Sequence, residues 1–156
     1  MTDNADYDAV KFLIVDDDEV SVMAIKRAMQ KLKLANPVRV AKDGIEALEI
    51  LRGNIDVDQI LPPYIITLDL SMPRMGGKEF LEEVRRDPVL QQAVIFVLTT
   101  SDAPGDIAAA YEKNIAGYIV KEPTTESLAE ALSLISDYAQ LVVLPRPNDS
   151  DVTPQS

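Results

Sequence analysis

The sequence predicts an α/β fold with a doubly wound, five-stranded parallel sheet. Five short apolar runs alternate with five segments whose apolar residues recur at helical spacing. This alternation is typical of a parallel sheet covered by helices on both faces, because each pair of parallel strands needs a crossover. The chain has 156 residues, 47% of them hydrophobic, which suits one domain with a buried core.

The expected strands and helices follow one another along the whole domain. The strands are expected at residues 11–15, 38–41, 64–69, 94–98 and 117–120. The helices are expected to begin near Val20, Asp43-Gly44, Gly77, Asp102-Ala103-Pro104 and Thr124 or Thr125. We expect Asn36-Pro37 to stop the first helix. Ile45, Leu48 and Leu51 are expected on the inner face of the second helix.

The domain is expected to span residues 11–144, between an acidic, flexible arm (1–10) and a disordered tail (145–156). The apolar stretch Leu141–Leu144 has two interpretations. It lengthens the last helix and packs on the core, or it is exposed and is covered by a second copy of the chain. The sequence leaves both open, so a homodimer is one expected state.

Composition excludes several classes of function. The formal net charge of −11 argues against binding to nucleic acid or to an anionic membrane surface. No apolar stretch is long enough to cross a bilayer, and the acidic start is no secretory signal, so we expect a cytoplasmic protein. The absence of cysteine and histidine excludes disulfides, thiolate zinc sites and Ser-His pairs. A bound metal should therefore be a hard, oxygen-liganded ion such as Mg²⁺.

Polar side chains stand at the carboxyl ends of four of the five strands. They are Asp16 and Asp17, Asp69, Thr99, and Lys121. In a sheet of strand order 2-1-3-4-5 these ends converge at the switch point between the first and third strands. Three crowded carboxylates cannot all ionise cheaply without a cation, which Mg²⁺ together with the lysine would supply.

Asp69 is the best placed nucleophile in this cluster. A carboxylate that attacks phosphorus forms an acyl phosphate, and phosphoryl transfer asks little more of a protein than positioning and charge neutralisation. Thr99 could then donate a hydrogen bond to a phosphoryl oxygen. Before that, we expect its hydroxyl to bond to the backbone at the end of its strand.

Four segments together resemble the response-regulator receiver domain of two-component signalling. They are Ile14–Asp17, Leu68–Gly77, Leu98–Ser101 and Gly117–Lys121, in order and at suitable spacing over about residues 10–140. The resemblance implies the flavodoxin-like receiver fold. It implies a regulator that takes a phosphoryl group from a sensor histidine kinase and signals by phosphorylation-dependent protein–protein contacts or by relay transfer. Such a protein catalyses only its own phosphorylation and dephosphorylation.

The resemblance also implies roles for individual residues. By this similarity Asp69 is the phospho-acceptor, and Asp17, Asp69 and the backbone carbonyl of Ser71 hold the metal. Asp16 would act mostly through water, and Lys121 would contact the phosphoryl group.

A conformational switch is implied in the same way, with Thr99 drawn to the phosphoryl group and Tyr118 rotating into the vacated space. The long loop before the third strand, Val97–Ser101 and the segment Asp106–Tyr111 resemble single-domain regulators that partner bacterial phytochromes. A phytochrome kinase is therefore one expected partner.

One position departs from the receiver pattern. The family usually has a proline with a cis bond directly after the lysine, whereas here Glu122 follows Lys121 and Pro123 comes one residue later. A cis bond before a non-proline residue costs about 2.5–4 kcal/mol, so either the site imposes it or the loop is trans. The Glu122 carboxylate would also compete for the lysine.

Other interpretations of these residues need no phosphoryl transfer. Asp16 to Glu19 suit a solvated helix amino terminus, Asp69 could begin an Asx turn, and Tyr118 could be simple packing. The main alternative function is an inert interaction module that keeps the fold but is never phosphorylated. Glu122, in place of the usual proline, is the sequence feature that favours it. A flavodoxin-type nucleotide binder would need a Ser/Thr/Gly-rich loop where this chain has four acidic residues. A phosphatase acting through aspartate would want an acid-base carboxylate where Ser71 stands.

Overall fold

A computed structural model describes residues 9–54, 57–121 and 125–145. It contains one sheet of five parallel strands in the order β2-β1-β3-β4-β5, as the sequence predicted. The strands are β1 (Lys11–Val15), β2 (Val38–Ala41), β3 (Tyr64–Leu68), β4 (Val94–Thr99) and β5 (Gly117–Val120). The switch point between β1 and β3 therefore exists, and the carboxyl ends of both strands open onto the same edge.

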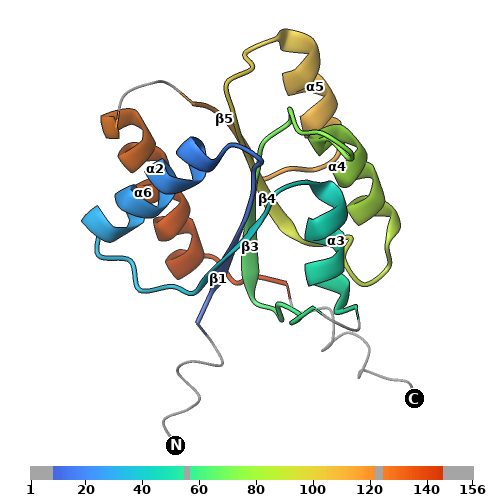
Figure 1. Cartoon of the computed structure of the whole chain (residues 1–156), viewed down its shortest axis with the longest axis horizontal. Helices are drawn as coiled ribbons and strands as arrows, with labels where there is room; N and C mark the ends of the chain where they lie inside the picture. The colour runs from blue at the N-terminus through green and yellow to red at the C-terminus, as the bar shows by residue number, and fades with distance from the viewer. Residues whose placement is uncertain (1–8, 55–56, 122–124, 146–156) are drawn as a thin grey trace, which may run out of the picture.

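Helices cover both faces of the sheet (Figure 1). They are α2 (Glu19–Lys31), α3 (Gly44–Arg52), α4 (Gly77–Arg86), α5 (Pro104–Glu112) and α6 (Thr125–Leu141). Helices α3, α4 and α5 contribute to one core layer, and α2 and α6 contribute to the other.

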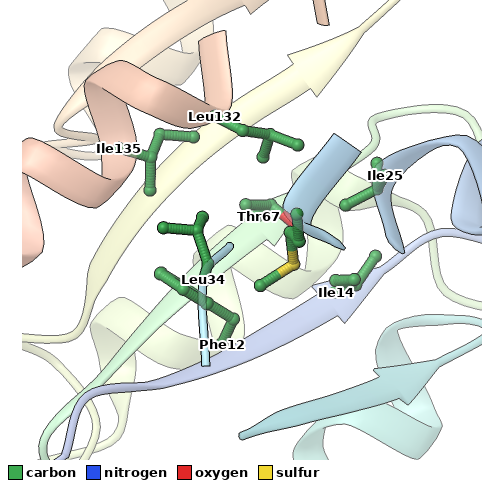
Figure 2. A pocket seen from close by; sticks show the side chains of 8 residues that line it. Phe12, Ile14, Ile25, Leu34, Thr67, Leu132 and Ile135 are labelled. Atoms are coloured by element: carbon green, nitrogen blue, oxygen red, sulfur yellow. The ribbon is translucent and has the colours of Figure 1, made fainter. Parts of the chain in front are cut away.

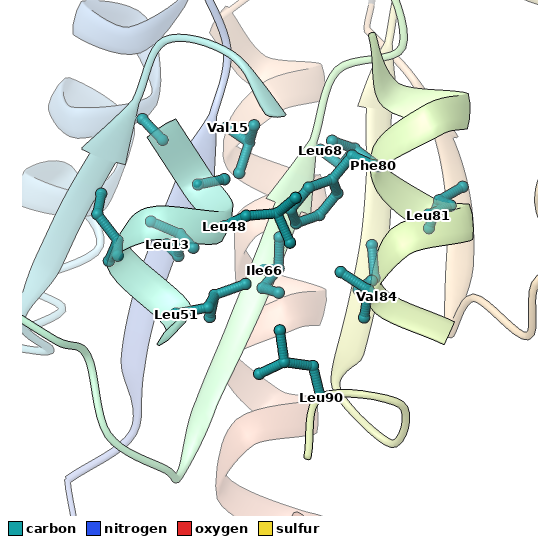
Figure 3. Packing of buried hydrophobic residues seen from close by; sticks show 14 of the residues in the cluster. Leu13, Val15, Leu48, Leu51, Ile66, Leu68, Phe80, Leu81, Val84 and Leu90 are labelled. Atoms are coloured by element: carbon teal, nitrogen blue, oxygen red, sulfur yellow. The ribbon is translucent and has the colours of Figure 1, made fainter. Parts of the chain in front are cut away.

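Alternation along the strands builds the two layers. Successive side chains of a strand point to opposite faces, so a strand buried on both sides is apolar throughout. On β1, Leu13 and Val15 face the α3–α4–α5 layer, whereas Phe12 and Ile14 face α2 and α6. Figure 3 shows the first layer, in which the Phe80 ring of α4 lies among aliphatic side chains of β1, β3 and α3.

Two local predictions were wrong. Helix α2 ends at Lys31, well before Asn36-Pro37, because Leu32 caps it and Lys33 turns into the left-handed region at φ 58°. Ile45 is 36% exposed in the first turn of α3, and it is not among the buried residues of that helix. Leu48 and Leu51 are buried as expected.

The loop between β3 and α4 runs very close to the first residues of its helix. The Gly77 amide donates to the Leu70 carbonyl over 3.1 Å. A Cβ atom at Gly77 would lie 2.7 Å from both the Asp69 carbonyl oxygen and the Leu70 Cα. Only glycine fits there, so this contact fixes the path of the chain just after Asp69.

The stretch Leu141–Leu144 is part buried and part exposed, and its burial against a second copy of the chain stays a prediction. Helix α6 ends at Leu141, and Leu144 folds back into the core at 7% exposure. Leu141 and Val143 remain 83% and 96% exposed. The predicted arm (1–10) and tail (145–156) fall almost wholly outside the described residues. No helix within the described ranges has the length and apolarity needed to span a bilayer.

The layer beneath α2 and α6 contains one buried hydroxyl that makes no hydrogen bond within the described structure, that of Thr67 on β3. It lines a small cavity of about 10 Å³, whose other lining side chains, such as Ile25 and Leu132, are apolar (Figure 2). That volume holds one water molecule at most, and a water needs two or more polar partners. The hydroxyl is therefore buried at a net cost.

Replacing Thr67 by valine should raise the free energy of unfolding by about 1–2 kcal/mol, because the substitution removes an unpaired polar group and keeps the shape. Chemical denaturation of both proteins measures the difference. The matched control is Thr99→Val on the neighbouring strand, whose hydroxyl donates to Asp69, so the same change should lower stability. Equal effects of the two substitutions would contradict the explanation.

Candidate functional site

Three carboxylates meet at the carboxyl edge of the sheet. Asp16 and Asp17 follow β1 and Asp69 follows β3, whose last residues, Val15 and Leu68, pair in the parallel register. The Asp69 amide donates to the Val15 carbonyl over 2.9 Å, which extends this register to the site. One oxygen from each carboxylate lies within 4.8 Å of the other two. The structure thus brings the predicted acidic cluster together.

The members of the cluster differ in their exposure to water. Asp16 is 2% exposed and Asp69 is 9% exposed, whereas Asp17 is open to solvent. Burial raises the pKa of Asp16 above its ordinary value, although hydrogen bonds from the Asp18 amide and from Lys121 oppose that shift. Ionised Asp16 is therefore costly in the free protein, and a cation nearby would relieve that cost.

Lys121 reaches the cluster from the end of β5, and its side chain is 12% exposed. Its ammonium lies 3.0 Å from Asp16 Oδ2 and 3.9 Å from Asp69 Oδ2, and it also donates to the Ser21 hydroxyl. The lysine is therefore paired first with Asp16 and lies within reach of Asp69. The predicted competition from Glu122, and the isomer of the bond before it, lie outside the described residues.

Thr99 is fully buried at the end of β4 and bonds directly to Asp69. Its Oγ1 donates to Asp69 Oδ1 over 2.8 Å, so the expected resting bond to the backbone was wrong. The reason is that β3 and β4 are neighbours, which places this hydroxyl beside the carboxylate. The Ser71 amide makes a second, longer contact of 3.4 Å to the same oxygen.

Tyr118 lies half-buried on β5 against the α3–α4–α5 layer. Its hydroxyl donates to the Ser101 carbonyl over 2.9 Å, in the segment that joins β4 to α5. The Ser101 hydroxyl in turn donates to Asp106, which pairs with Lys78 of α4 at 2.7 Å. Hydrogen bonds from Lys78 and Ser101 hold the pKa of Asp106 below its usual range. Tyr118 is thus bonded to the segment that begins at Thr99.

Sequence reasoning missed the roles of Ser21 and Asp18. Asp18 is the N-cap of α2, where Oδ1 accepts from the Val20 amide and Oδ2 accepts from the Ser21 hydroxyl. The Asp-x-x-Ser spacing at a helix start was the available signal. These bonds hold the first turn of α2 in place. They also hold the Ser21 hydroxyl where it accepts a hydrogen bond from Lys121.

The donor set suits a hard divalent cation. The three carboxylates supply only oxygen, the ligand that Mg²⁺ prefers, and the exposed Asp17 leaves room for the waters that this ion keeps. Three negative groups face a single ammonium, so the cluster is short of positive charge. Asp17, Asp69 and Asp16 are the residues that would hold such an ion.

Comparisons with known proteins find similarity over most of the chain. A family model described as the response regulator receiver domain matches residues 12–133. The chain is 31% identical over 126 residues to the probable methanogenesis regulatory protein FilR2 of Methanothrix harundinacea, covering 81% of each chain.

Two solved structures are similar over most of their length. The Mn²⁺-bound form of response regulator Rcp1, a protein of Synechocystis, has a TM-score of 0.78 at 26% identity, over 87% of this chain and 99% of that one. The phosphorylated cyanobacterial phytochrome response regulator RcpA has a TM-score of 0.80 at 28% identity, over 88% and 99%.

Asp17→Asn should weaken Mg²⁺ binding at least about 10-fold, because it removes a charged ligand and leaves the buried pair around Lys121 intact. At an Mg²⁺ concentration ten times the wild-type Kd, the ion should stabilise the wild type by about 1.4 kcal/mol and the variant by about 0.4 kcal/mol or less. Calorimetric titration and thermal melting measure both quantities.

Glu19→Gln is the matched control. It also removes one negative charge, only two residues after Asp17, but Glu19 is exposed and is not part of the carboxylate cluster. Its Mg²⁺ affinity should stay within about twofold of the wild type, as screening of an exposed charge predicts. If Asp17→Asn behaves like this control, Asp17 is not a ligand.

Proposed function

The chain belongs to the response regulator receiver domain family, and on that premise we propose that it is a phosphorylation switch. Asp69 accepts a phosphoryl group from a sensor histidine kinase. The arrangement of Asp16, Asp17 and Asp69 within 4.8 Å, with Lys121 and Thr99 against two of them, is the observation that carries this proposal. Residues 11–144 form the switch.

The two carboxylate oxygens of Asp69 differ in their hydrogen bonds. Oδ1 accepts from the Thr99 hydroxyl over 2.8 Å and from the Ser71 amide over 3.4 Å. Oδ2 accepts no hydrogen bond within the described part of the chain, so it is the oxygen proposed to react. In the proposed reaction a carboxylate oxygen attacks phosphorus, a P–O bond forms, and the bond from phosphorus to the donor's imidazole nitrogen breaks. The imidazole leaves with that electron pair, and an acyl phosphate remains on Asp69.

Charge neutralisation is the main requirement of this step. Bound Mg²⁺ would supply positive charge for the phosphoryl oxygens and the carboxylates. Lys121, 3.9 Å from Asp69 Oδ2, holds its ammonium beside the carboxylate and can pair with the incoming phosphoryl group. Asp16 and Ser21 hold the lysine in place. We propose Asp17, Asp69 and the Ser71 carbonyl as the direct protein ligands of the ion, with Asp16 acting mostly through water.

Thr99 and Tyr118 are proposed to convert phosphorylation of Asp69 into a change of the protein surface. When the phosphoryl group arrives, the Thr99 hydroxyl leaves Asp69 Oδ1 and donates to a phosphoryl oxygen. That movement displaces the β4–α5 segment, whose Ser101 carbonyl holds the Tyr118 hydroxyl. The surface formed by this segment, α5 and Tyr118 therefore differs between the two states and is proposed to contact the downstream protein or relay partner.

A phytochrome is a proposed kinase class, on the strength of the similarity to RcpA, a phytochrome response regulator. A cytoplasmic location follows from a kinase donor of this kind. Exposed Leu141 and Val143 favour a homodimer as a further output. The inert interaction module is the weaker alternative, because the residues that the chemistry needs lie together at one edge of the sheet. The carboxylates of Asp16, Asp17 and Asp69 lie within 4.8 Å of one another. Thr99 donates to Asp69, and Lys121 donates to Asp16.

Asp69→Asn should abolish phosphorylation by acetyl phosphate and Mg²⁺, because an amide cannot form the acyl phosphate. Intact-mass spectrometry of the wild type should show one added phosphate, and the variant should show none while it keeps the far-UV circular dichroism of the wild type. Asp102→Asn, at an exposed carboxylate beyond β4, is the control that should still react. A wild type that stays unmodified under these conditions would overturn the proposed function in favour of the inert module.

A further inference from the structure

Asp43 is the only buried carboxylate in the described part of the chain that lies outside the Asp16, Asp17 and Asp69 cluster. It is 2% exposed and caps α3, where its Oδ1 accepts from the Glu46 amide over 2.8 Å. The Glu46 side chain in turn accepts from the Lys42 amide, so side chains at Asp43 and Glu46 both hydrogen-bond to the backbone at the start of α3. The second oxygen of Asp43 is therefore held at a fixed position and needs a donor.

Arg74 supplies that donor from the loop between β3 and α4. Its Nε donates to Asp43 Oδ2 over 2.7 Å, across 31 positions of sequence. Arg74 adopts a φ of 63°, which non-glycine residues seldom do. Next to it, the Met75 carbonyl accepts from the Gly44 amide over 3.0 Å. Two hydrogen bonds thus join the tip of this loop to the first residues of α3.

The base of the same loop is fixed as well. The Gly77 amide closes it onto the Leu70 carbonyl, and the Ser71 amide contacts Asp69 Oδ1. Burial would raise the pKa of Asp43, but the hydrogen bonds from Arg74 and the Glu46 amide outweigh burial and hold it below its ordinary value. Asp43 is therefore charged near neutral pH and keeps Arg74 in place.

We propose that Asp43 and Arg74 are positioning residues for the cation site: they hold the β3–α4 loop so that Ser71 lies beside Asp69 before the ion binds. The inference rests on the proposed function, which assigns the Ser71 carbonyl to the ion. A loop released at its tip would have to be ordered when the ion binds, and that loss of conformational freedom lowers affinity. Groups that bond directly to metal ligands commonly affect metal affinity about 10- to 100-fold. Asp43 and Arg74 act through the backbone of the loop, so we expect an effect at the lower end of that range.

We call the Asp43–Arg74 hydrogen bond the clamp. The substitution Asp43→Asn removes the clamp and keeps the helix cap. Asparagine caps helices as well as aspartate does, so its one oxygen can still accept from Glu46. The amide nitrogen then faces Arg74 Nε, donor against donor, and the bond to the loop is lost. We expect Mg²⁺ affinity by calorimetry to fall about 10-fold. The Mg²⁺ concentration for half-maximal reaction with acetyl phosphate should rise by the same factor, with the rate recovered at saturating Mg²⁺.

Arg74→Gln breaks the clamp from its half-exposed end and should give the same change if the two residues act together. The double variant should then lose no more affinity than either single variant. Arg52→Gln is the matched control, because it removes an arginine from an ion pair with Asp87 at the other end of α3. Its Mg²⁺ affinity should equal that of the wild type.

Variants that lower the melting temperature but bind Mg²⁺ like the wild type would overturn the inference and leave the clamp a purely structural contact. So would additive losses in the double variant. Because affinity is measured without phosphorylation, the two proposals fail separately. A wild type that binds Mg²⁺ but forms no adduct overturns the proposed function alone, and the affinities of the variants still decide the role of the clamp.

Discussion

Lys121 places an ammonium beside two carboxylates that are almost out of water, and the chemistry of the site depends on this contact. It lies 3.0 Å from Asp16 and 3.9 Å from Asp69, with 12% of its own side chain exposed. Without it, Asp16 and Asp69 would repel each other in a poorly solvated place. With it, three negative groups including Asp17 still face one positive group. That deficit is the physical reason why we propose that a divalent ion binds here.

The sheet makes this cluster possible because its strands are parallel and because β1 lies next to β3. The pairing of Val15 with Leu68 sets Asp16, Asp17 and Asp69 at one level. The backbone beyond Asp69 is then held by close contacts. Gly77 admits no side chain against the Asp69 carbonyl. The tip of the same loop bonds to α3, so these contacts hold the backbone around Asp69 on both sides of the loop.

Thr99 gives the same carboxylate a connection to the surface. Its hydroxyl stabilises Asp69 in the free protein, and its backbone begins the segment that leads into α5. That segment is bonded to Tyr118 through the Ser101 carbonyl and to α4 through Asp106 and Lys78. A change in the bonding of Asp69 therefore acts on a group of linked contacts. This is a suitable arrangement for a switch read by another protein.

The order of strands and helices, and the residues at the strand ends, could be predicted from the sequence. Apolar runs and helical spacing are local, and parallel strands send all their carboxyl ends to one edge, so Asp16, Asp69 and Lys121 had to meet if the strand order was right. Partners across long sequence separations could not be predicted in this way. Only the tertiary structure decided that Thr99 bonds to Asp69, that Lys121 pairs first with Asp16, and that Asp43 bonds to Arg74. It also buried Leu144 while leaving Val143 in solvent. These outcomes depend on which side chains packing brings within hydrogen-bond reach, and local sequence patterns do not encode that.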